Sequence, residues 1–208
     1  MRKIREVPGF SSVVSSKRNL PMAVAAVDVH RWTREDYERM AAEGYFAPDA
    51  RVELVDGVVY DMSPQKGPHT TCLHLALHAL TRLFPDAYVR VQSPLALSDD
   101  SEPEPDLAVV RGTVEDYANE HPTTALLVVE VADSSLAHDA GTKIPLYARC
   151  RIPEAWLLDV KAKILKVHRD PVEGLYQAQQ VLRTGDTVSP LARREARISV
   201  AAFFPKDP

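Results

Sequence analysis

The sequence predicts a single α/β domain in which helices flank a mixed central β-sheet. The chain has 208 residues, which is the length of one ordinary domain. Hydrophobic residues make up 45% of it and charged residues 26%, as in an average globular protein. Helix-like and strand-like apolar patterns both occur along the chain, without an internal repeat, so helices and strands should share one core.

The composition also excludes several classes of protein. No stretch approaches the roughly 18 apolar residues that a membrane helix needs, so no membrane partner is expected. The net charge of −4 argues against a polycation that coats nucleic acid. Two cysteines, Cys72 and Cys150, are too few for a disulfide framework and lie in no CxxC pair. They indicate reduced thiols in a cytoplasmic protein.

The beginning of the chain differs from the rest. Residues 1–20 carry five basic side chains and lack the apolar core of a secretory signal. We expect residues 1–30 to form a flexible extension, with Met22 as an alternative start of translation, and residues 31–208 to form the domain.

Two helices and a hairpin are predicted in the first half. Thr33 is a helix N-cap with Asp36 as its acidic partner three residues later, and the helix runs toward Gly44. Asp-Gly at 56–57, between two apolar runs, predicts a hairpin. After a loop at 63–68, leucines and a phenylalanine recur at spacings of four, three and four, which predicts a helix over 69–84.

The second half consists mainly of predicted strands. They span residues 88–92, 107–110, 125–131, 155–160, 164–168 and 176–182, and an apolar segment over 198–204 ends the chain. The uninterrupted apolar run over 125–131 is typical of a central strand that is buried on both faces. A helix is expected within 135–150, with Pro145 in its first turn or at a kink.

Glu130 is the residue that fits this pattern least well. Every neighbour in Leu126-Leu-Val-Val-Glu-Val131 is apolar, and a buried carboxylate is normally paired, protonated or bound to a metal. Asp106 begins the preceding strand, and Glu53 lies in the hairpin. Three carboxylates at strand ends repel one another, and Mg²⁺ prefers such hard oxygen ligands. The alternative is that Glu130 faces solvent on an edge strand and Asp106 belongs to a turn.

Lys143 favours a catalytic interpretation of these carboxylates over a structural one. A lysine beside a carboxylate–metal site can orient or deprotonate the attacking water, whose pKa the metal itself lowers. Such a set is suited to the hydrolysis of a phosphodiester. We expect Glu53, Asp106, Glu130 and Lys143 to converge, with Lys143 within roughly 6 Å of Asp106 or Glu130. Mutual repulsion should raise the pKa of Asp106 or of Glu130.

Several segments, in this order and spacing, resemble the Uma-type family of restriction endonucleases, within the PD-(D/E)XK nuclease superfamily. They are Arg51-Val-Glu-Leu-Val-Asp-Gly-Val-Val-Tyr60, Glu104-Pro-Asp-Leu-Ala-Val-Val110, Leu127-Val-Val-Glu-Val-Ala-Asp-Ser-Ser135, Asp139-Ala-Gly-Thr-Lys143 with Tyr147-Ala148, and Ile152-Pro-Glu-Ala-Trp156. The resemblance covers roughly residues 32–204. It implies a restriction-endonuclease-like fold and metal-dependent cleavage of nucleic acid, most often DNA, by a homodimer.

The resemblance also implies roles for individual residues. Asp106 and Glu130 would bind Mg²⁺, for which Mn²⁺ can substitute, with Glu53 as a third carboxylate. Lys143 would be the water-orienting base or a charge stabiliser, and Gln92 and His69 would lie near the site. The superfamily usually places its lysine two residues after the glutamate, where this chain has Ala132. In the Uma-type family the lysine is on the following helix, as Lys143 is here.

Other features of the sequence have simpler interpretations. His74 and His78 share a helix face, but no third ligand accompanies them, so a solvent-facing pair is expected. Residues 143–170 contain seven basic and three acidic side chains, which could meet a phosphate backbone or form an ordinary charged surface. The rival to a nuclease is an inactive member of the fold that binds nucleic acid or protein. A hydrolase acting on another phosphoester is a third alternative.

Overall fold

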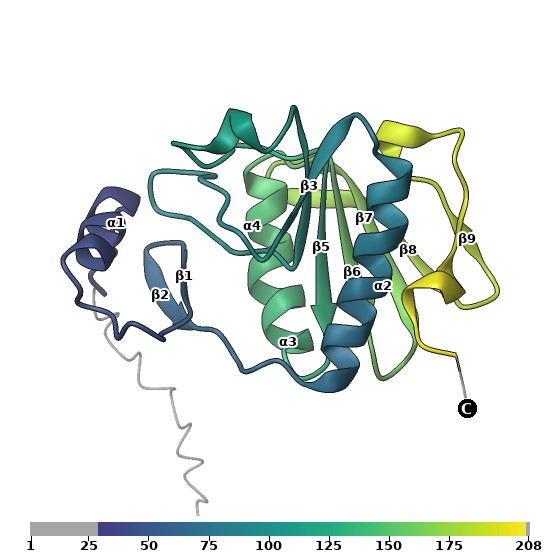
Figure 1. The fold of residues 1–208 in the computed structure, drawn as a ribbon, viewed down its shortest axis with the longest axis horizontal. Helices are drawn as coiled ribbons and strands as arrows, with labels where there is room; N and C mark the ends of the chain where they lie inside the picture. Colours follow the sequence, from purple (N-terminus) through teal and green to yellow (C-terminus); the bar gives the residue numbers. More distant parts are fainter. Residues whose placement is uncertain (1–28, 207–208) are drawn as a thin grey trace, which may run out of the picture.

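A computed structural model describes residues 29–206 and confirms the predicted class of fold: a six-stranded mixed sheet flanked by helices (Figure 1). The strands are β3 (Ala87–Val91), β4 (Leu107–Arg111), β5 (Leu127–Ala132), β6 (Glu154–Asp159), β7 (Ile164–Val172) and β8 (Leu175–Arg183), in that spatial order. The N-terminal extension expected over residues 1–30 lies, up to residue 28, outside the described residues, as does Met22.

One parallel pair determines the layout of the sheet. β5 and β6 are parallel, and all other neighbouring strands in this sheet are antiparallel. A parallel pair requires a crossover connection, and the chain between these strands supplies it. The crossover contains α3 (Leu136–His138), a π-helical turn over Asp139–Lys143, and α4 (Ile144–Arg149).

The two faces of the sheet are covered by different helices. β5 is buried along its whole length, as its apolar run predicted. Its odd-numbered residues pack in the core beneath α2 (Gly67–Leu83), and Val128 and Ala132 pack with α4 on the other face. Because side chains alternate between the two faces of a strand, Glu130, which lies between Val128 and Ala132, also points toward α4.

Helix α2 begins two residues before the expected position. The chain was expected to form a loop up to Pro68, but Lys66 is the N-cap and Pro68 lies in the first turn. Proline is tolerated there because the first N–H groups of a helix have no partner within the helix. His69 lies in the first helical turn and contacts Asp106, which directly precedes β4.

A separate unit lies beside the main sheet. It consists of α1 (Arg34–Ala42) and the hairpin of β1 (Val52–Val55) and β2 (Val58–Asp61). Thr33 and Asp36 form the predicted capping box of α1. The hairpin is joined to the rest of the protein by a β-bridge between Leu54 and Glu102. The side chain next to this bridge is that of Glu53.

The turn of this hairpin gives a first prediction. Gly57 has a φ of +72°, and a Cβ added there would lie 2.7 Å from the Arg31 Cβ. Gly57→Ala should therefore lower the free energy of unfolding by about 1–2 kcal/mol, because both the backbone and the contact become strained. Urea titration measures this change. The control is Gly67→Ala, at a position with open space, and it should leave stability equal or higher; equal losses in both variants would contradict the prediction.

The C-terminal segment closes the core beneath α2. β9 (Thr187–Val188) pairs with β10 (Ile198–Ser199), and a 3₁₀ turn over Val200–Phe203 follows. The sequence did not predict β9. The expected apolar segment at the end of the chain does pack, since the Phe203 ring contacts Trp156 at 5.7 Å between centroids. Trp156 is therefore a core residue.

A buried histidine on β7 gives a second prediction. Both ring nitrogens of His168 are buried without a hydrogen-bond partner, and burial, with a smaller effect of Lys166, lowers the pKa of His168. The unfolded chain then takes up a proton first as the pH falls below about 6.5, so stability is lost in that range. His168→Leu should remove this loss. The free energy of unfolding is measured for the wild type and for His168→Leu at pH 8 and at pH 5. Between these pH values the wild type should lose more stability than the variant. An equal difference between the two proteins at both pH values would contradict the prediction.

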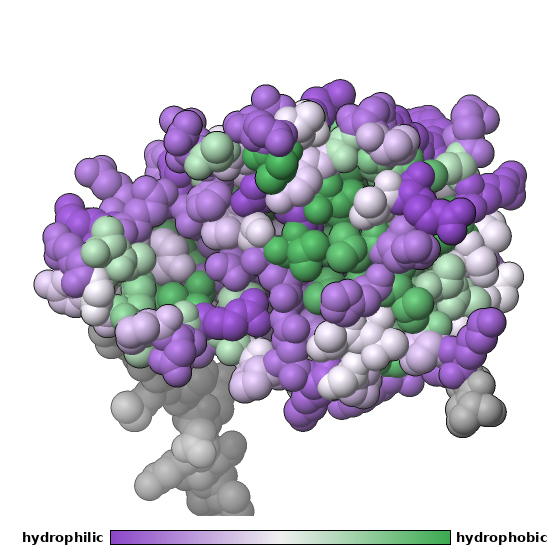
Figure 2. All heavy atoms as spheres, in the orientation of Figure 1, coloured by the Kyte–Doolittle hydropathy of each residue, from purple (hydrophilic) through white to green (hydrophobic). Residues whose placement is uncertain are grey.

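The surface seen from the α2 side is mostly hydrophilic, with apolar side chains gathered near the middle of the view (Figure 2). Cys72 is buried and Cys150 half-buried, and neither forms a disulfide. Among residues 29–206, no helix is long and apolar enough to cross a membrane.

Candidate active site

Three predicted site residues form one row across adjacent strands. The antiparallel register that pairs Leu107 with Val129 brings Asp106 opposite Glu130 one step further along. The β3–β4 register likewise brings Gln92 opposite Asp106, and the Gln92 N–H donates to the Asp106 carbonyl at 3.1 Å. The carboxyl end of β5 therefore meets the start of β4 and the end of β3 at the site.

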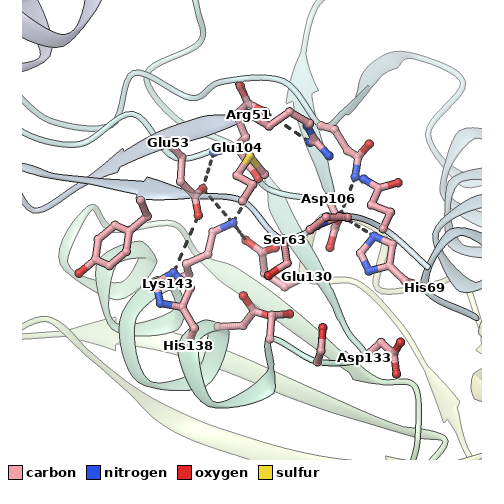
Figure 3. Close-up of a pocket in the computed structure, with 18 of the residues that line it drawn as sticks. Arg51, Glu53, Ser63, His69, Glu104, Asp106, Glu130, Asp133, His138 and Lys143 are labelled. Carbon is pink, nitrogen blue, oxygen red and sulfur yellow. Dashed lines mark hydrogen bonds and ion pairs between the residues drawn. The ribbon is translucent and has the colours of Figure 1, made fainter. Parts of the chain in front are cut away.

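Polar groups from three directions surround Asp106. The Val131 N–H donates to its Oδ2 at 2.8 Å, and the Gln92 amide donates to its Oδ1 at 3.0 Å. His69 Nε2 lies 3.1 Å from the same Oδ1 (Figure 3). Although burial favours the neutral acid, His69 and the Val131 N–H hold the pKa of Asp106 below its usual value. Asp106 is therefore a carboxylate at neutral pH.

Glu130 has the opposite electrostatic environment. Its side chain is only 2% exposed, and its Oε1 accepts hydrogen bonds from Lys143 Nζ, at 2.9 Å, and from the Tyr147 hydroxyl. Burial raises its pKa to about 8, although Lys143 opposes the change. One of the two carboxyl groups was expected to have a raised pKa, and Glu130 does. The main cause is burial, and the contribution of Asp106 is smaller.

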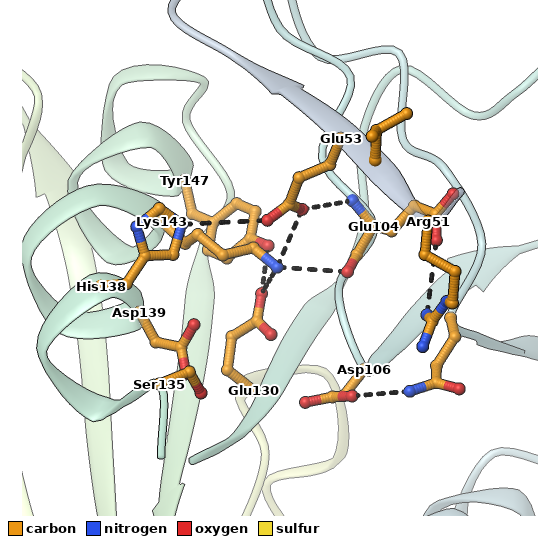
Figure 4. A network of polar contacts seen from close by, with 12 residues as sticks. Arg51, Glu53, Glu104, Asp106, Glu130, Ser135, His138, Asp139, Lys143 and Tyr147 are labelled. Atoms are coloured by element: carbon orange, nitrogen blue, oxygen red, sulfur yellow. Dashed lines mark hydrogen bonds and ion pairs between the residues drawn. The ribbon is translucent and has the colours of Figure 1, made fainter. Parts of the chain in front are cut away.

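The Lys143 ammonium uses all three of its N–H donors. It contacts Glu130 Oε1 at 2.9 Å, Glu53 Oε2 at 3.1 Å and the Glu104 carbonyl at 3.1 Å (Figure 4). Although burial opposes the charge, Glu130 and Glu53 raise the pKa of Lys143. A protonated amine with no free donor cannot accept a proton from water. This geometry fits a charge stabiliser and does not fit a general base.

Glu53 reaches the site from the hairpin. Its Oε2 accepts from Lys143 and also from the Glu104 N–H at 3.0 Å, and its side chain is buried. His138 Nε2 lies 3.9 Å from the other oxygen. The structure therefore places Glu53 on the far side of Lys143 from Glu130, as Figure 4 shows.

These side chains line one cavity of about 270 Å³. Its lining includes every residue that the sequence analysis placed at or near the site, namely Glu53, His69, Gln92, Asp106, Glu130 and Lys143. Lys143 is 2.9 Å from Glu130, well within the expected limit of roughly 6 Å. Arg51 and Lys66 also line the cavity and bring positive charge to an otherwise acidic group of residues.

Two residues of the site, Tyr147 and Glu104, have no role predicted from the sequence. Tyr147 follows Lys143 by four residues, and this spacing on a helix places both side chains on one face. Glu104 supplies its backbone N–H and carbonyl to Glu53 and Lys143, and its carboxylate lies 3.7 Å from Arg51. A backbone contact has no signature in the residue types, so the part played by Glu104 required the structure.

The other candidates have structural roles or lie at the surface. His74 and His78 are exposed, as expected. Part of the basic excess over 143–170 is turned inward, because Lys143 is buried in the site and Arg169 donates to the buried Glu154 at 2.7 Å. The basic face expected for a phosphate backbone is therefore smaller than the count of charges suggests.

The donor chemistry of the site fits a hard divalent cation. Asp106 and Glu130 lie in one row, and the contacts of Lys143 and Tyr147 with Glu130 are both to its Oε1. His69 Nε2 is buried and forms no hydrogen bond, and its polar contact is the ion pair with Asp106 Oδ1 at 3.1 Å. Among residues 29–206, however, no three His, Cys, Asp or Glu side chains already surround a common point. Glu53, held by Lys143, is the poorest candidate for a ligand.

The comparisons with known proteins that found a match both lead to proteins described as nucleases. Residues 34–201 match the model of the Uma2 family, described as "Putative restriction endonuclease". A crystal structure of "a putative nuclease belonging to DUF820" from Anabaena variabilis ATCC 29413 superposes with a TM-score of 0.69 at 16% sequence identity. The match covers 83% of this chain and 97% of that chain, and at this identity it shows a common fold. No curated protein matches the sequence.

Proposed function

The chain belongs to the Uma2 family, and from that premise we propose that it is a metal-dependent endonuclease that hydrolyses phosphodiester bonds of DNA. The observation that carries the proposal is the row of Asp106 and Glu130 on adjacent strands, with the Lys143 ammonium on Glu130, in a single cavity. In such a row two carboxylates can bind one cation while a fixed positive charge limits their repulsion.

Each residue of the site has a proposed role in binding the cation or in orienting its ligands. Asp106 and Glu130 would hold Mg²⁺ or Mn²⁺, and a cation bound there would lower the pKa of the attacking water and neutralise charge on the phosphate. Gln92 and the Val131 N–H fix the orientation of Asp106. Tyr147 and Lys143 do the same for Glu130 through Oε1.

Lys143 and Glu53 receive roles that differ from the expectation for the family. With its three donors occupied, Lys143 is the counter-charge that holds Glu130 in position, and it is not the base. Glu53 is proposed as the partner of Lys143 and not as a third ligand of the cation. Arg51 and Lys66, at the same cavity, are suited to bind the phosphates that flank the cleaved bond.

The test uses metal-stripped protein and a covalently closed plasmid, which only an endonuclease can nick or linearise. Addition of Mg²⁺ or Mn²⁺ should produce nicked or linear DNA, and EDTA should prevent it. A single-stranded circle and an RNA of equal length establish which nucleic acid is the substrate. Cleavage of RNA alone, or of no nucleic acid with either ion, would overturn the proposal.

One observation favours a second candidate, an inactive member of the fold that binds nucleic acid. Lys143 already neutralises Glu53 and Glu130, and no three-ligand group stands assembled in the described part of the chain. DNA binding that is unchanged by EDTA, without cleavage, would support this candidate.

We also propose a homodimer, since two copies of one site are needed to cut both strands of a duplex at once. β8 is at the edge of the sheet, and its Leu175 and Val181 side chains are 62% and 55% exposed on one face. Exposed apolar side chains on an edge strand are typical of a contact surface. Sedimentation at micromolar concentration should show a dimer, and a monomer would indicate nicking or single-strand cleavage.

A further inference from the structure

His69 has an unusual position beside the row of carboxylates. It lies in the first turn of α2, with a side chain only 13% exposed, and its Nε2 is directed at the site (Figure 3). That atom is buried, is 3.1 Å from Asp106 Oδ1, and forms no hydrogen bond. The Val131 N–H and the Gln92 amide already donate hydrogen bonds to the Asp106 carboxylate.

A buried polar nitrogen that forms no hydrogen bond is costly, and such an atom requires an explanation. The distance between His69 Nε2 and Asp106 Oδ1 offers an explanation. Two ligands on neighbouring corners of an octahedron, each about 2.1 Å from the ion, are about 3.0 Å apart. His69 Nε2 and Asp106 Oδ1, at 3.1 Å, therefore already stand at the separation of two ligands of one cation.

We propose that His69 binds the divalent cation directly, beside Asp106, so that the site prefers transition metals to Mg²⁺. The proposal rests on the metal-dependent function proposed above and specifies which ion serves it. Imidazole nitrogen suits first-row transition metals, whereas Mg²⁺ favours a set of oxygens. The order of affinity should be Mg²⁺ below Mn²⁺, and Mn²⁺ below Co²⁺ and Ni²⁺.

The arrangement of the neighbouring residues supports a ligand more than a simple ion pair. His69 Nε2 and Asp106 Oδ1 are within ion-pair distance, at 3.1 Å, but the contact does not have the geometry of a hydrogen bond, which a simple ion pair of these two groups would have. Asp106 does not need a third donor, because Val131 and Gln92 already orient both of its oxygens. The second carboxylate oxygen of Glu130, and water, would complete the coordination.

The test measures the bound ion and does not depend on cleavage. Metal-stripped wild-type protein is titrated with MnCl₂ and with MgCl₂, and the bound Mn²⁺ is examined by pulsed electron paramagnetic resonance. We expect the modulation that a directly coordinated imidazole nitrogen produces. His69→Gln should abolish this modulation and weaken Mn²⁺ binding at least about tenfold, with a smaller change for Mg²⁺. His74→Gln, an exposed histidine on the same helix, should change neither.

Each outcome decides between the proposals. If Mn²⁺ binds the wild type and supports DNA cleavage without a nitrogen signal, His69 is not a ligand and the nuclease function stands. An unchanged Mn²⁺ affinity in a folded His69→Gln protein leads to the same conclusion. If neither ion binds the wild type, both proposals fail. The nitrogen signal of the wild type gives an answer even if the His69 variant does not fold.

Discussion

Asp106→Asn and Glu130→Gln should each reduce metal-dependent DNA cleavage at least about a thousandfold, which is roughly 4 kcal/mol of transition-state stabilisation. Each change removes one negative charge from the row while nearly preserving the shape of the side chain. Without that charge the cation binds weakly, and the attacking water loses its activation. Initial rates of plasmid nicking in Mn²⁺, measured for the three proteins at equal concentration, give the size of the effect.

Asp170→Asn is the matched control for this experiment. Asp170 is exposed on β7 and has a φ of +57°, which asparagine adopts readily. This variant should cleave as the wild type does, which also excludes a contaminating nuclease. Mn²⁺ should raise the melting temperature of the wild type and of Asp170→Asn, because it binds only the folded protein, and should have much less effect on the two site variants. Undiminished cleavage by Asp106→Asn would contradict the assigned site.

Lys143→Met should lower the free energy of unfolding of the metal-free protein by about 3 kcal/mol or more. The change leaves Glu53 and Glu130, both buried, without the ammonium that contacts them at 3.1 and 2.9 Å. Removal of one partner from a buried ion pair typically costs about 3–5 kcal/mol, because the remaining charge is desolvated and unpaired. Urea unfolding in EDTA at pH 8 measures the loss.

A double variant separates this charge effect from a loss of packing. Lys143→Met combined with Glu130→Gln removes one of the two buried carboxylates that the loss of Lys143 leaves unpaired. Tyr147 can still donate a hydrogen bond to the amide oxygen of the new side chain. The double variant should therefore be more stable than Lys143→Met alone. If it is less stable by the sum of the two single losses, Lys143 acts through packing and not as a counter-charge.

The residue pattern was enough to predict most of the fold. The apolar run around Glu130 predicted a strand buried on both faces, and β5 is one. The capping box at Thr33 and the Asp-Gly hairpin were also predicted correctly, because both signals are local. Helix α2 begins two residues before the predicted start, because Pro68 fits a first helical turn as well as the end of a loop, and the pattern does not predict the short strand β9.

The sequence by itself determined which residue types are available for the candidate site. A carboxylate in an apolar strand, a second at the start of the preceding strand and a lysine on the next helix define a class of chemistry. Only the tertiary structure decided how they are used. Strand register brought Asp106 opposite Glu130, and the hairpin brought Glu53 to Lys143. The Glu104 carbonyl occupied the last donor of that lysine. Such contacts join residues far apart along the chain, often through backbone atoms that every residue shares, so no local pattern of side chains can encode them.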